Sequence, residues 1–223
     1  MEISEGIAGK QTGVVVVDMQ GDFTQLKSGS LAVEGTGLTY LHDVDKATRI
    51  FREKGLKIFA TQDWHPADHI SFFSNTPGKQ PFDTIEINGN RQILWPPHCV
   101  QDSENARLLL DENLFEEIVR KGTDPAHDSY SGFQDDGGIE TRLDTVLKSA
   151  QINTVIVYGL ATDFCVKATA MDALDRGYGV VVITSLCKGV APDSTTEALE
   201  QMQDRGIILT EESDPDVIAS LLS

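Results

Sequence analysis

The sequence predicts a doubly wound α/β fold, in which helices cover both faces of a mostly parallel sheet and give three layers. Two observations lead to this prediction. Continuous β-branched runs, such as those in Thr12–Asp18 (TGVVVVD) and Gly179–Thr184 (GVVVIT), are typical of strands buried on both faces. Segments with apolar residues at helical spacing alternate with these runs. We therefore expect right-handed strand–helix–strand units, with ligands at the carboxyl ends of the strands.

The first half of the chain begins with the strand Thr12–Asp18. A helix is predicted over Leu38–Lys54, because apolar residues recur there at helical spacing up to Gly55, a suitable C-cap. Leu56–Thr61 (LKIFAT) is the next predicted strand. The stretch from Gln62 to about Asp102 contains five prolines, which disfavour long regular elements. A loop this long is usually functional or disordered, and its five aromatic residues favour an ordered one.

The second half continues the alternation of strands and helices. The predicted strands are Phe115–Lys121, Thr154–Tyr158, Gly179–Thr184 and Gly206–Leu209. The predicted helices are Gly138–Ala150, Asp163–Arg176 and Ser194–Asp204. No internal repeat or low-complexity linker interrupts the pattern, so we expect a single domain over residues 1–223 with one long loop at about 62–102.

Composition restricts the class of protein. The 223 residues include 18 Lys and Arg against 35 Asp and Glu, a formal net charge of −17. Nucleic-acid binding needs cations that displace counterions from phosphates, and docking on anionic lipid needs them as well. We therefore expect neither a nucleic-acid partner nor a membrane partner. Hydrophobic residues make up 40% of the chain, which suits a globular domain with a sizeable core.

The three cysteines are Cys99, Cys165 and Cys187, too few and too uneven in number for a disulfide framework. They fit a reducing compartment. The N-terminal segment lacks the basic start and apolar run of a signal peptide, and no apolar stretch is long enough to span a bilayer. The expected location is the cytoplasm.

Chemically versatile side chains follow the predicted strands at their carboxyl ends. Asp18 ends the first strand, Asp63 and His65 follow the second, Lys121 ends the third and Cys165 follows the fourth. In a parallel sheet these ends share one edge. Residues that are far apart in the sequence can therefore meet there.

Two interpretations of Cys165 have about equal weight. It lies just inside a predicted helix, where free amides and the helix dipole stabilise a thiolate, so it can be a nucleophile. It can equally be a small buried hydrophobic residue, the reading we favour for Cys99 and Cys187. Asp18 could accept the thiol proton or only cap a turn, and Lys121 could hold the ionised pair together or be an ordinary solvated lysine. Their joint placement at one sheet edge favours chemistry.

Asp63 and His65 are candidate metal ligands. In an extended chain alternate residues point to the same side, so both can bind one ion. Carboxylate oxygen and imidazole nitrogen suit zinc, iron or manganese. A third ligand is needed, and His98 and His69 are the candidates.

Five motifs are spread over most of the chain: VVVVDMQGDF (Val14–Phe23), TQDWHPADHISF (Thr61–Phe72), WPPHC (Trp95–Cys99), VRKG with SYSGF (Val119–Gly122 and Ser129–Phe133), and GLATDFCVKATAMDA (Gly159–Ala173). In sequence and order they resemble the motifs of the nicotinamidases, or pyrazinamidases, of the isochorismatase-like cysteine hydrolase family. The resemblance implies the doubly wound fold of that family and a cysteine nucleophile.

The resemblance also assigns catalytic roles. Asp18, Lys121 and Cys165 match the catalytic triad of the family. The Leu160–Ala161 bond matches a cis peptide of the family, and the amides of Ala161 and Cys165 would then form an oxyanion hole.

The metal and substrate residues follow from the same resemblance. Asp63, His65 and His98 match the ligands of one divalent metal ion, with zinc expected before iron or manganese. His69 matches a histidine that supports the site and in some members binds the metal. The aromatic walls of the substrate pocket match Phe23, Trp95 and Tyr130.

The implied activity is the metal-dependent hydrolysis of nicotinamide to nicotinate and ammonia through a thioester, a step in NAD salvage. One alternative is another hydrolase of the superfamily, acting on isochorismate or on a small carbamoyl or ureido compound. A second is a nucleotide- or flavin-binding domain without covalent chemistry, which needs a Gly-rich phosphate turn where this chain has the acidic Asp18–Asp22 (DMQGD). Residues Asn75–Gln92 match no motif. We expect this segment either to set the substrate range or to form a contact between subunits of a homo-oligomer.

Overall fold

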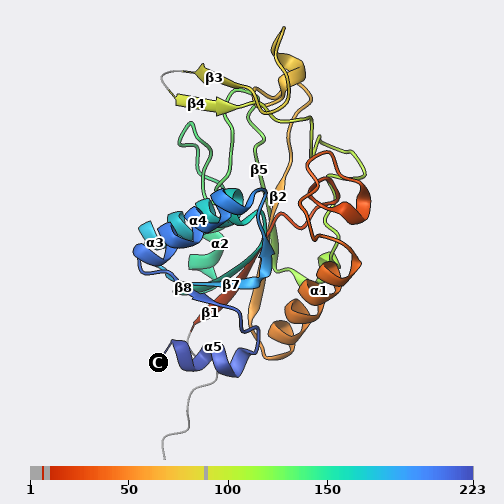
Figure 1. Cartoon of the computed structure of the whole chain (residues 1–223). Helices are drawn as coiled ribbons and strands as arrows, with labels where there is room; N and C mark the ends of the chain where they lie inside the picture. The colour runs from red at the N-terminus through yellow and green to blue at the C-terminus, as the bar shows by residue number, and fades with distance from the viewer. Residues whose placement is uncertain (1–6, 8–10, 88–89, 223) are drawn as a thin grey trace, which may run out of the picture.

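A parallel sheet of six strands lies at the centre of the structure, a computed structural model that describes residues 7, 11–87 and 90–222 (Figure 1). The strand order is β5-β2-β1-β6-β7-β8, and neighbouring strands are parallel throughout. The strands are β1 (Thr12–Val17), β2 (Lys57–Asp63), β5 (Glu117–Lys121), β6 (Thr154–Leu160), β7 (Gly179–Lys188) and β8 (Ile208–Thr210). The predicted fold class is confirmed.

The central strand β1 shows why these residues form a sheet. All six of its residues are buried. Val14 pairs with Ile58 of β2 on one side and with Ile156 of β6 on the other. Burying one such aliphatic side chain contributes roughly 1.5–3 kcal/mol, so a run of valines favours a strand with neighbours on both edges and helices on both faces.

Helices cover the two faces of the sheet: α1 lies on one face, and α2, α3 and α4 lie together on the other (Figure 1). The apolar side of α1 includes Val44, Ala47 and Phe51, all buried. Phe51 stacks on Tyr158 of β6 with ring centroids 6.2 Å apart. The helices are α1 (Leu38–Glu53), α2 (Leu143–Ser149), α3 (Lys167–Asp175), α4 (Pro192–Asp204) and α5 (Pro215–Leu221).

The order of the strands creates a crevice between β1 and β6. From β1 the chain crosses over α1 to β2 on one side, whereas from β6 it crosses over α3 to β7 on the other. In doubly wound sheets ligands bind at the carboxyl ends of the two strands where this reversal occurs. Asp18 follows β1 and Cys165 follows β6, so both flank this crevice.

Some predicted elements have different limits in the structure. The helix predicted over Gly138–Ala150 begins only at Leu143. The residues before it form a turn, in which Ile139 donates its amide hydrogen to Asp135 and Thr141 Oγ1 accepts one from Leu143. Side-chain acceptors of this kind compete with helix formation. β7 also extends beyond the predicted strand, to Lys188.

A hairpin of two strands and a short helix were not predicted. The irregular stretch at 62–102 contains an antiparallel hairpin of β3 (Thr84–Ile87) and β4 (Asn90–Ile93), which lies beyond the carboxyl ends of β2 and β5 (Figure 1). The short helix α5 follows β8, and Asp214 caps it by accepting a hydrogen bond from the amide of Asp216.

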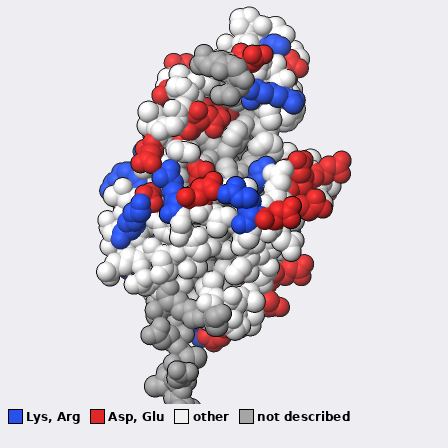
Figure 2. All heavy atoms as spheres, turned by 90° about the vertical axis from the view of Figure 1, so that its left-hand side faces the viewer, with Lys and Arg blue, Asp and Glu red and all other residues white. Residues whose placement is uncertain are grey.

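The surface mixes both signs of charge. On the face shown in Figure 2, Lys and Arg side chains lie among Asp and Glu side chains across the middle of the molecule. Among the helices in the described part of the chain, none is both long and apolar enough to cross a membrane.

Candidate active site

A buried lysine at the end of β5 joins the polar groups of the site. Lys121 pairs in register with Asp63, the last residue of β2, and its side chain is fully buried. Its Nζ lies 3.0 Å from Asp18 Oδ2 and 3.4 Å from the sulfur of Cys165. It also contacts Asp63 Oδ1 and donates to the carbonyl of Ser129 at 2.8 Å. Burial alone would lower the pKa of Lys121, but the two carboxylates raise it well above its ordinary value, so the amine is cationic.

Asp18 has the properties of a base. Its Oδ1 accepts a hydrogen bond of 2.6 Å from Thr61. Its Oδ2 forms the ion pair with Lys121 and has no hydrogen-bond partner among the described residues. Burial raises the pKa of Asp18 to about 6, although Lys121 and the hydrogen bond from Thr61 oppose the increase. A carboxylate with a pKa near neutrality and an open lone pair can accept a proton.

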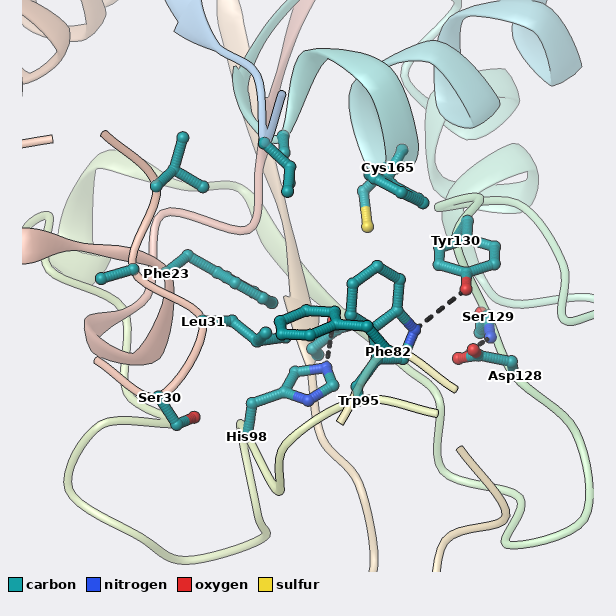
Figure 3. A pocket seen from close by; sticks show the side chains of 16 residues that line it. Phe23, Ser30, Leu31, Phe82, Trp95, His98, Asp128, Ser129, Tyr130 and Cys165 are labelled. Atoms are coloured by element: carbon teal, nitrogen blue, oxygen red, sulfur yellow. Dashed lines mark hydrogen bonds and ion pairs between the residues drawn. The ribbon is translucent and has the colours of Figure 1, made fainter. Parts of the chain in front are cut away.

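The helix predicted over Asp163–Arg176 begins as a π-helix, Thr162–Val166, which contains Cys165. The sulfur of Cys165 points into the pocket (Figure 3), and one carboxylate oxygen each of Asp18 and Asp63 lies within 4.8 Å of it. Burial raises the pKa of the thiol well above its ordinary value, and the two carboxylates add to the increase. The expectation that the helix N-terminus stabilises a thiolate is therefore wrong. The resting group is a thiol and needs a base.

The turn that carries Cys165 is fixed on both sides. The peptide bond between Leu160 and Ala161 is cis, as the resemblance implies. The buried carboxylate of Asp163 accepts a hydrogen bond of 2.9 Å from the amide of Val190, just before α4. Ala161 and Cys165 both line the pocket, so the backbone of this turn borders the space that a substrate would occupy.

Asp63, His65 and His98 form a buried cluster in which one ligand atom of each lies within 4.8 Å of the others. Nε2 of His65 and Nε2 of His98 lie 3.5 Å and 4.0 Å from Asp63 Oδ2. The Nδ1 atoms donate instead to the backbone carbonyls of Gly122 at 2.9 Å and Pro96 at 2.8 Å. Metal-binding histidines are commonly held in this way, which leaves the other nitrogen for the ion. The donor set fits a divalent ion such as zinc.

The charge states of Asp63 and His98 favour the same interpretation. Burial by itself would raise the pKa of Asp63, but Lys121 and His65 outweigh it and hold the pKa below its usual range. Burial lowers the pKa of His98 to about 4, and the neighbouring His65 adds to this effect. Asp63 is thus anionic and His98 neutral near pH 7, the protonation states that a metal requires of these ligands, whereas Asp63 raises the pKa of His65, so a metal would compete there with a proton.

His69 lies beside the cluster and outside it. Its ring centroid is 4.2 Å from that of His65. Both ring nitrogens have hydrogen-bond partners, Ser71 Oγ at 2.7 Å from Nδ1 and the carbonyl of His127 at 3.1 Å from Nε2. Burial lowers the pKa of His69 to about 4, so the ring is neutral and donates only through Nε2. This geometry favours a supporting role over metal ligation.

Both groups contribute to the lining of one pocket with a volume of about 180 Å³, Cys165 from the first group and Asp63 and His98 from the second (Figure 3). The three predicted aromatic walls, Phe23, Trp95 and Tyr130, all line it together with Cys165 and His98. Trp95 Nε1 donates a hydrogen bond of 3.0 Å to the Tyr130 hydroxyl. In the view of Figure 3 the sulfur lies on one side of these rings and His98 on the other.

Sequence reasoning missed several residues of the pocket. Phe164 packs edge-on against Trp95 with centroids 5.1 Å apart, and its position next to Cys165 was a signal for it. Asp128, directly before the SYSGF motif, lines the pocket, and its charge helps to raise the pKa of His65. Phe82 also lines the pocket, but it lies in the segment without a motif.

A buried glutamine that sequence reasoning did not single out fixes the end of β2. Gln20 Nε2 donates to the carbonyls of Asp63 and Ala106 at 2.8 Å each, and its Oε1 accepts from the amide of Asp63 at 2.8 Å. The backbone of Asp63 is thereby held on both sides. The fixed backbone therefore positions the Asp63 carboxylate, which Lys121 and the two histidines share.

A buried thiol, a carboxylate base and a lysine at the switch point of a doubly wound sheet are the residues of a cysteine hydrolase. The Asp/His/His cluster adds a candidate metal centre to the same pocket. Comparison with known proteins agrees: residues 12–214 match the isochorismatase domain family, and the chain belongs to that family.

Similar proteins cover nearly the whole chain. The nicotinamidase of Escherichia coli (strain K12) is 42% identical over 204 residues, which is 88% of this chain and 92% of the relative. The solved structure of a nicotinamidase and pyrazinamidase from Acinetobacter baumanii superimposes with a TM-score of 0.83 at 39% identity and covers 92% of this chain and 97% of that one. A pyrazinamidase from Pyrococcus horikoshii, solved in complex with zinc, gives a TM-score of 0.75 at 36% identity and covers 90% and 98%.

Proposed function

We propose that the protein is a nicotinamidase, a metal-dependent cysteine amidase that hydrolyses nicotinamide to nicotinate and ammonia. The observation that carries the proposal is a small aromatic pocket lined by Cys165 and by Asp63 and His98 of the Asp/His/His cluster, with Lys121 and Asp18 buried behind the sulfur. The similarity to nicotinamidases over most of the chain supports the same substrate.

The first half of the reaction forms a thioester. Asp18, whose pKa is about 6, takes the proton of the Cys165 thiol, and Lys121 stabilises the resulting charges. The thiolate attacks the carboxamide carbon and forms a C–S bond. The amides of Ala161 and Cys165, which both line the pocket, would donate to the oxyanion. The C–N bond then breaks, and the proton held by Asp18 passes to the leaving nitrogen, so ammonia departs as a neutral molecule.

The second half hydrolyses the thioester. Asp18 is again a carboxylate and takes a proton from an incoming water molecule, whose oxygen attacks the thioester carbon. The C–S bond breaks, Asp18 returns its proton to the sulfur, and the acid product loses its remaining proton to solvent and leaves as nicotinate. The buried Lys121 stays cationic throughout, because Asp63 remains an anion beside it even while Asp18 holds a proton.

The metal would be held by Asp63 Oδ2 and by Nε2 of His65 and His98. When bound, the ion supplies a Lewis acid that holds and orients the substrate ring. Zinc is our first assignment, because the donor set suits it and the Pyrococcus relative was solved with zinc. Iron and manganese accept the same donors.

The test is ammonia release from nicotinamide and from pyrazinamide, with and without prior chelation. We expect both amides to be cleaved, activity to be lost on chelation, and activity to return when zinc, iron or manganese is added back. A protein that binds no stoichiometric metal and leaves nicotinamide intact would contradict the proposal. Carbamoyl and ureido compounds would then be the substrates to try.

A further inference from the structure

Phe82 is an exposed aromatic residue at the mouth of the pocket. It is 59% exposed, against 6% for Trp95, although both line the same cavity. The two rings meet edge to face, with centroids 6.0 Å apart and an interplanar angle of 89°, and Figure 3 shows them next to each other. Phe82 therefore extends the wall formed by Trp95, Phe164 and Tyr130 out to the solvent.

The backbone holds Phe82 in a conformation that is unfavourable for a phenylalanine. Its φ is 70°, in the left-handed region where bulky residues are rare. The amide of Phe82 donates to the carbonyl of Leu94 at 2.6 Å, and the amide of Leu94 donates to the carbonyl of Asp83 at 2.8 Å. These two bonds hold Phe82 against Leu94, the residue that directly follows β4. The same loop uses a glycine, Gly78, at a φ of 77°. Residues with a strained backbone are concentrated at ligand sites, because the role they have there outweighs the conformational energy they cost.

We propose that Phe82 determines substrate size: its ring is the outer wall that closes the pocket over a single aromatic ring and excludes fused ring systems. The inference rests on the proposed function and deepens it. A single exposed apolar residue needs no explanation by itself. Here the exposed ring also shares a cavity with Cys165, packs on a wall residue and occupies a strained backbone position. A substrate ring beside Trp95 would cover the exposed Phe82 ring and remove apolar surface of both from water.

The experiment compares Phe82→Ala, Phe82→Leu and Phe82→Gly with the unaltered, metal-loaded protein. The two substrates are nicotinamide and quinoline-3-carboxamide, which keeps the ring nitrogen and the amide in the same relation and adds a fused ring. For Phe82→Ala we expect KM for nicotinamide to rise about three- to tenfold with little change in kcat, the loss of one aromatic contact. The ratio of kcat/KM for quinoline-3-carboxamide to that for nicotinamide should rise at least about tenfold. Phe82→Leu should fall between.

Two controls separate this role from a general effect on the fold. Ile139→Ala removes an apolar side chain that is 63% exposed and does not line the pocket, and it should leave both substrates unaffected. Phe82→Gly should melt at a temperature no lower than Phe82→Ala, because glycine adopts the left-handed conformation without strain.

The outcomes distinguish the inference from the proposed function. If the unaltered protein does not hydrolyse nicotinamide, the proposed function fails and the inference fails with it. If nicotinamide is hydrolysed but the selectivity ratio of Phe82→Ala stays within about twofold of the unaltered protein, below the effect of one lost contact, only the size filter is overturned.

Discussion

Two carboxylates at neighbouring strand ends share one lysine and nevertheless have opposite acid–base properties. Asp18, after β1, has its pKa raised to about 6. Asp63, at the end of β2, has its pKa held below the usual range. Both are fully buried beside Lys121. Burial is therefore not what distinguishes them.

The difference comes from the remaining neighbours of each group. Asp63 faces the cationic lysine and His65, whose pKa it raises, with the neutral His98 alongside, so it stays an anion. Asp18 faces the lysine, one hydroxyl and a thiol, and it can therefore gain and lose a proton. In the proposed mechanism, the half of the site around Asp18 transfers protons and the half around Asp63 binds a cation.

Cys165→Ala tests whether the two halves can be separated, and it has the largest expected effect. Activity on nicotinamide should fall by about 10⁴-fold or more, because the covalent route is removed. Metal content, measured on the purified protein, should stay the same, because the sulfur is no part of the Asp/His/His cluster. Loss of the metal together with activity would mean that the halves are a single unit.

Lys121→Met should damage both halves, because it removes the cation they share. Without it Asp18 and Asp63 face each other uncompensated, and breaking a buried ion pair in this way costs about 3–5 kcal/mol of stability. We expect kcat/KM to fall about 10³-fold as well. Chemical denaturation and steady-state kinetics measure the two effects.

A surface lysine provides the control for that substitution. Lys148 pairs with Asp144 at 2.7 Å and has a largely exposed side chain. Lys148→Met should change stability by less than about 1 kcal/mol and leave the kinetics unaltered. Equal effects of the two substitutions would refute the special role of the buried lysine.

The pH dependence of the reaction should report on the proton-transfer half. Asp18 must be ionised to accept the thiol proton, so kcat/KM should fall about tenfold per pH unit below about 6. Because its folded pKa lies above the ordinary 3.8, the native state holds a proton between these values that the unfolded chain has lost. This residue therefore stabilises the fold at low pH and loses that contribution as the pH rises through 6. If kcat/KM of the metal-saturated protein did not fall below pH 6, Asp18 would be excluded as the base.

Much of this site could be predicted because it depends on local patterns. The valine run of β1 and the apolar spacing of α1 are properties of short segments, and a parallel sheet brings its strand ends to one edge whatever the loops do. Asp18, Lys121 and Cys165 could be placed together on that basis. The motifs of the family then selected His98 from the histidines.

Other features depend on contacts between distant segments and have no local signal. The turn that places Phe82 at the pocket is locked by Leu94, and the hairpin β3–β4 separates the two along the chain. The high pKa of Cys165 arises from burial and from carboxylates on two other strands, which outweigh the helix terminus visible in the sequence. In the sequence Thr61 is only one more residue of a predicted strand, yet in the structure its hydroxyl donates a hydrogen bond from β2 to Asp18.

Thr61→Val makes the smallest change and tests the tuning of Asp18 most directly. The hydroxyl donates to Asp18 Oδ1 at 2.6 Å and opposes the increase in its pKa. A hydrogen bond to a charged group contributes about 1.5–3 kcal/mol, so its loss should move the acid limb of kcat/KM upward by about one to two pH units. Thr48→Val is the matched control, since Thr48 is also buried and bonds the Tyr158 hydroxyl at 2.9 Å, away from the pocket. Both variants lose a buried hydrogen bond and should be destabilised, but only Thr61→Val should shift the pH profile. An unshifted profile would mean that burial and Lys121 alone set the basicity of Asp18.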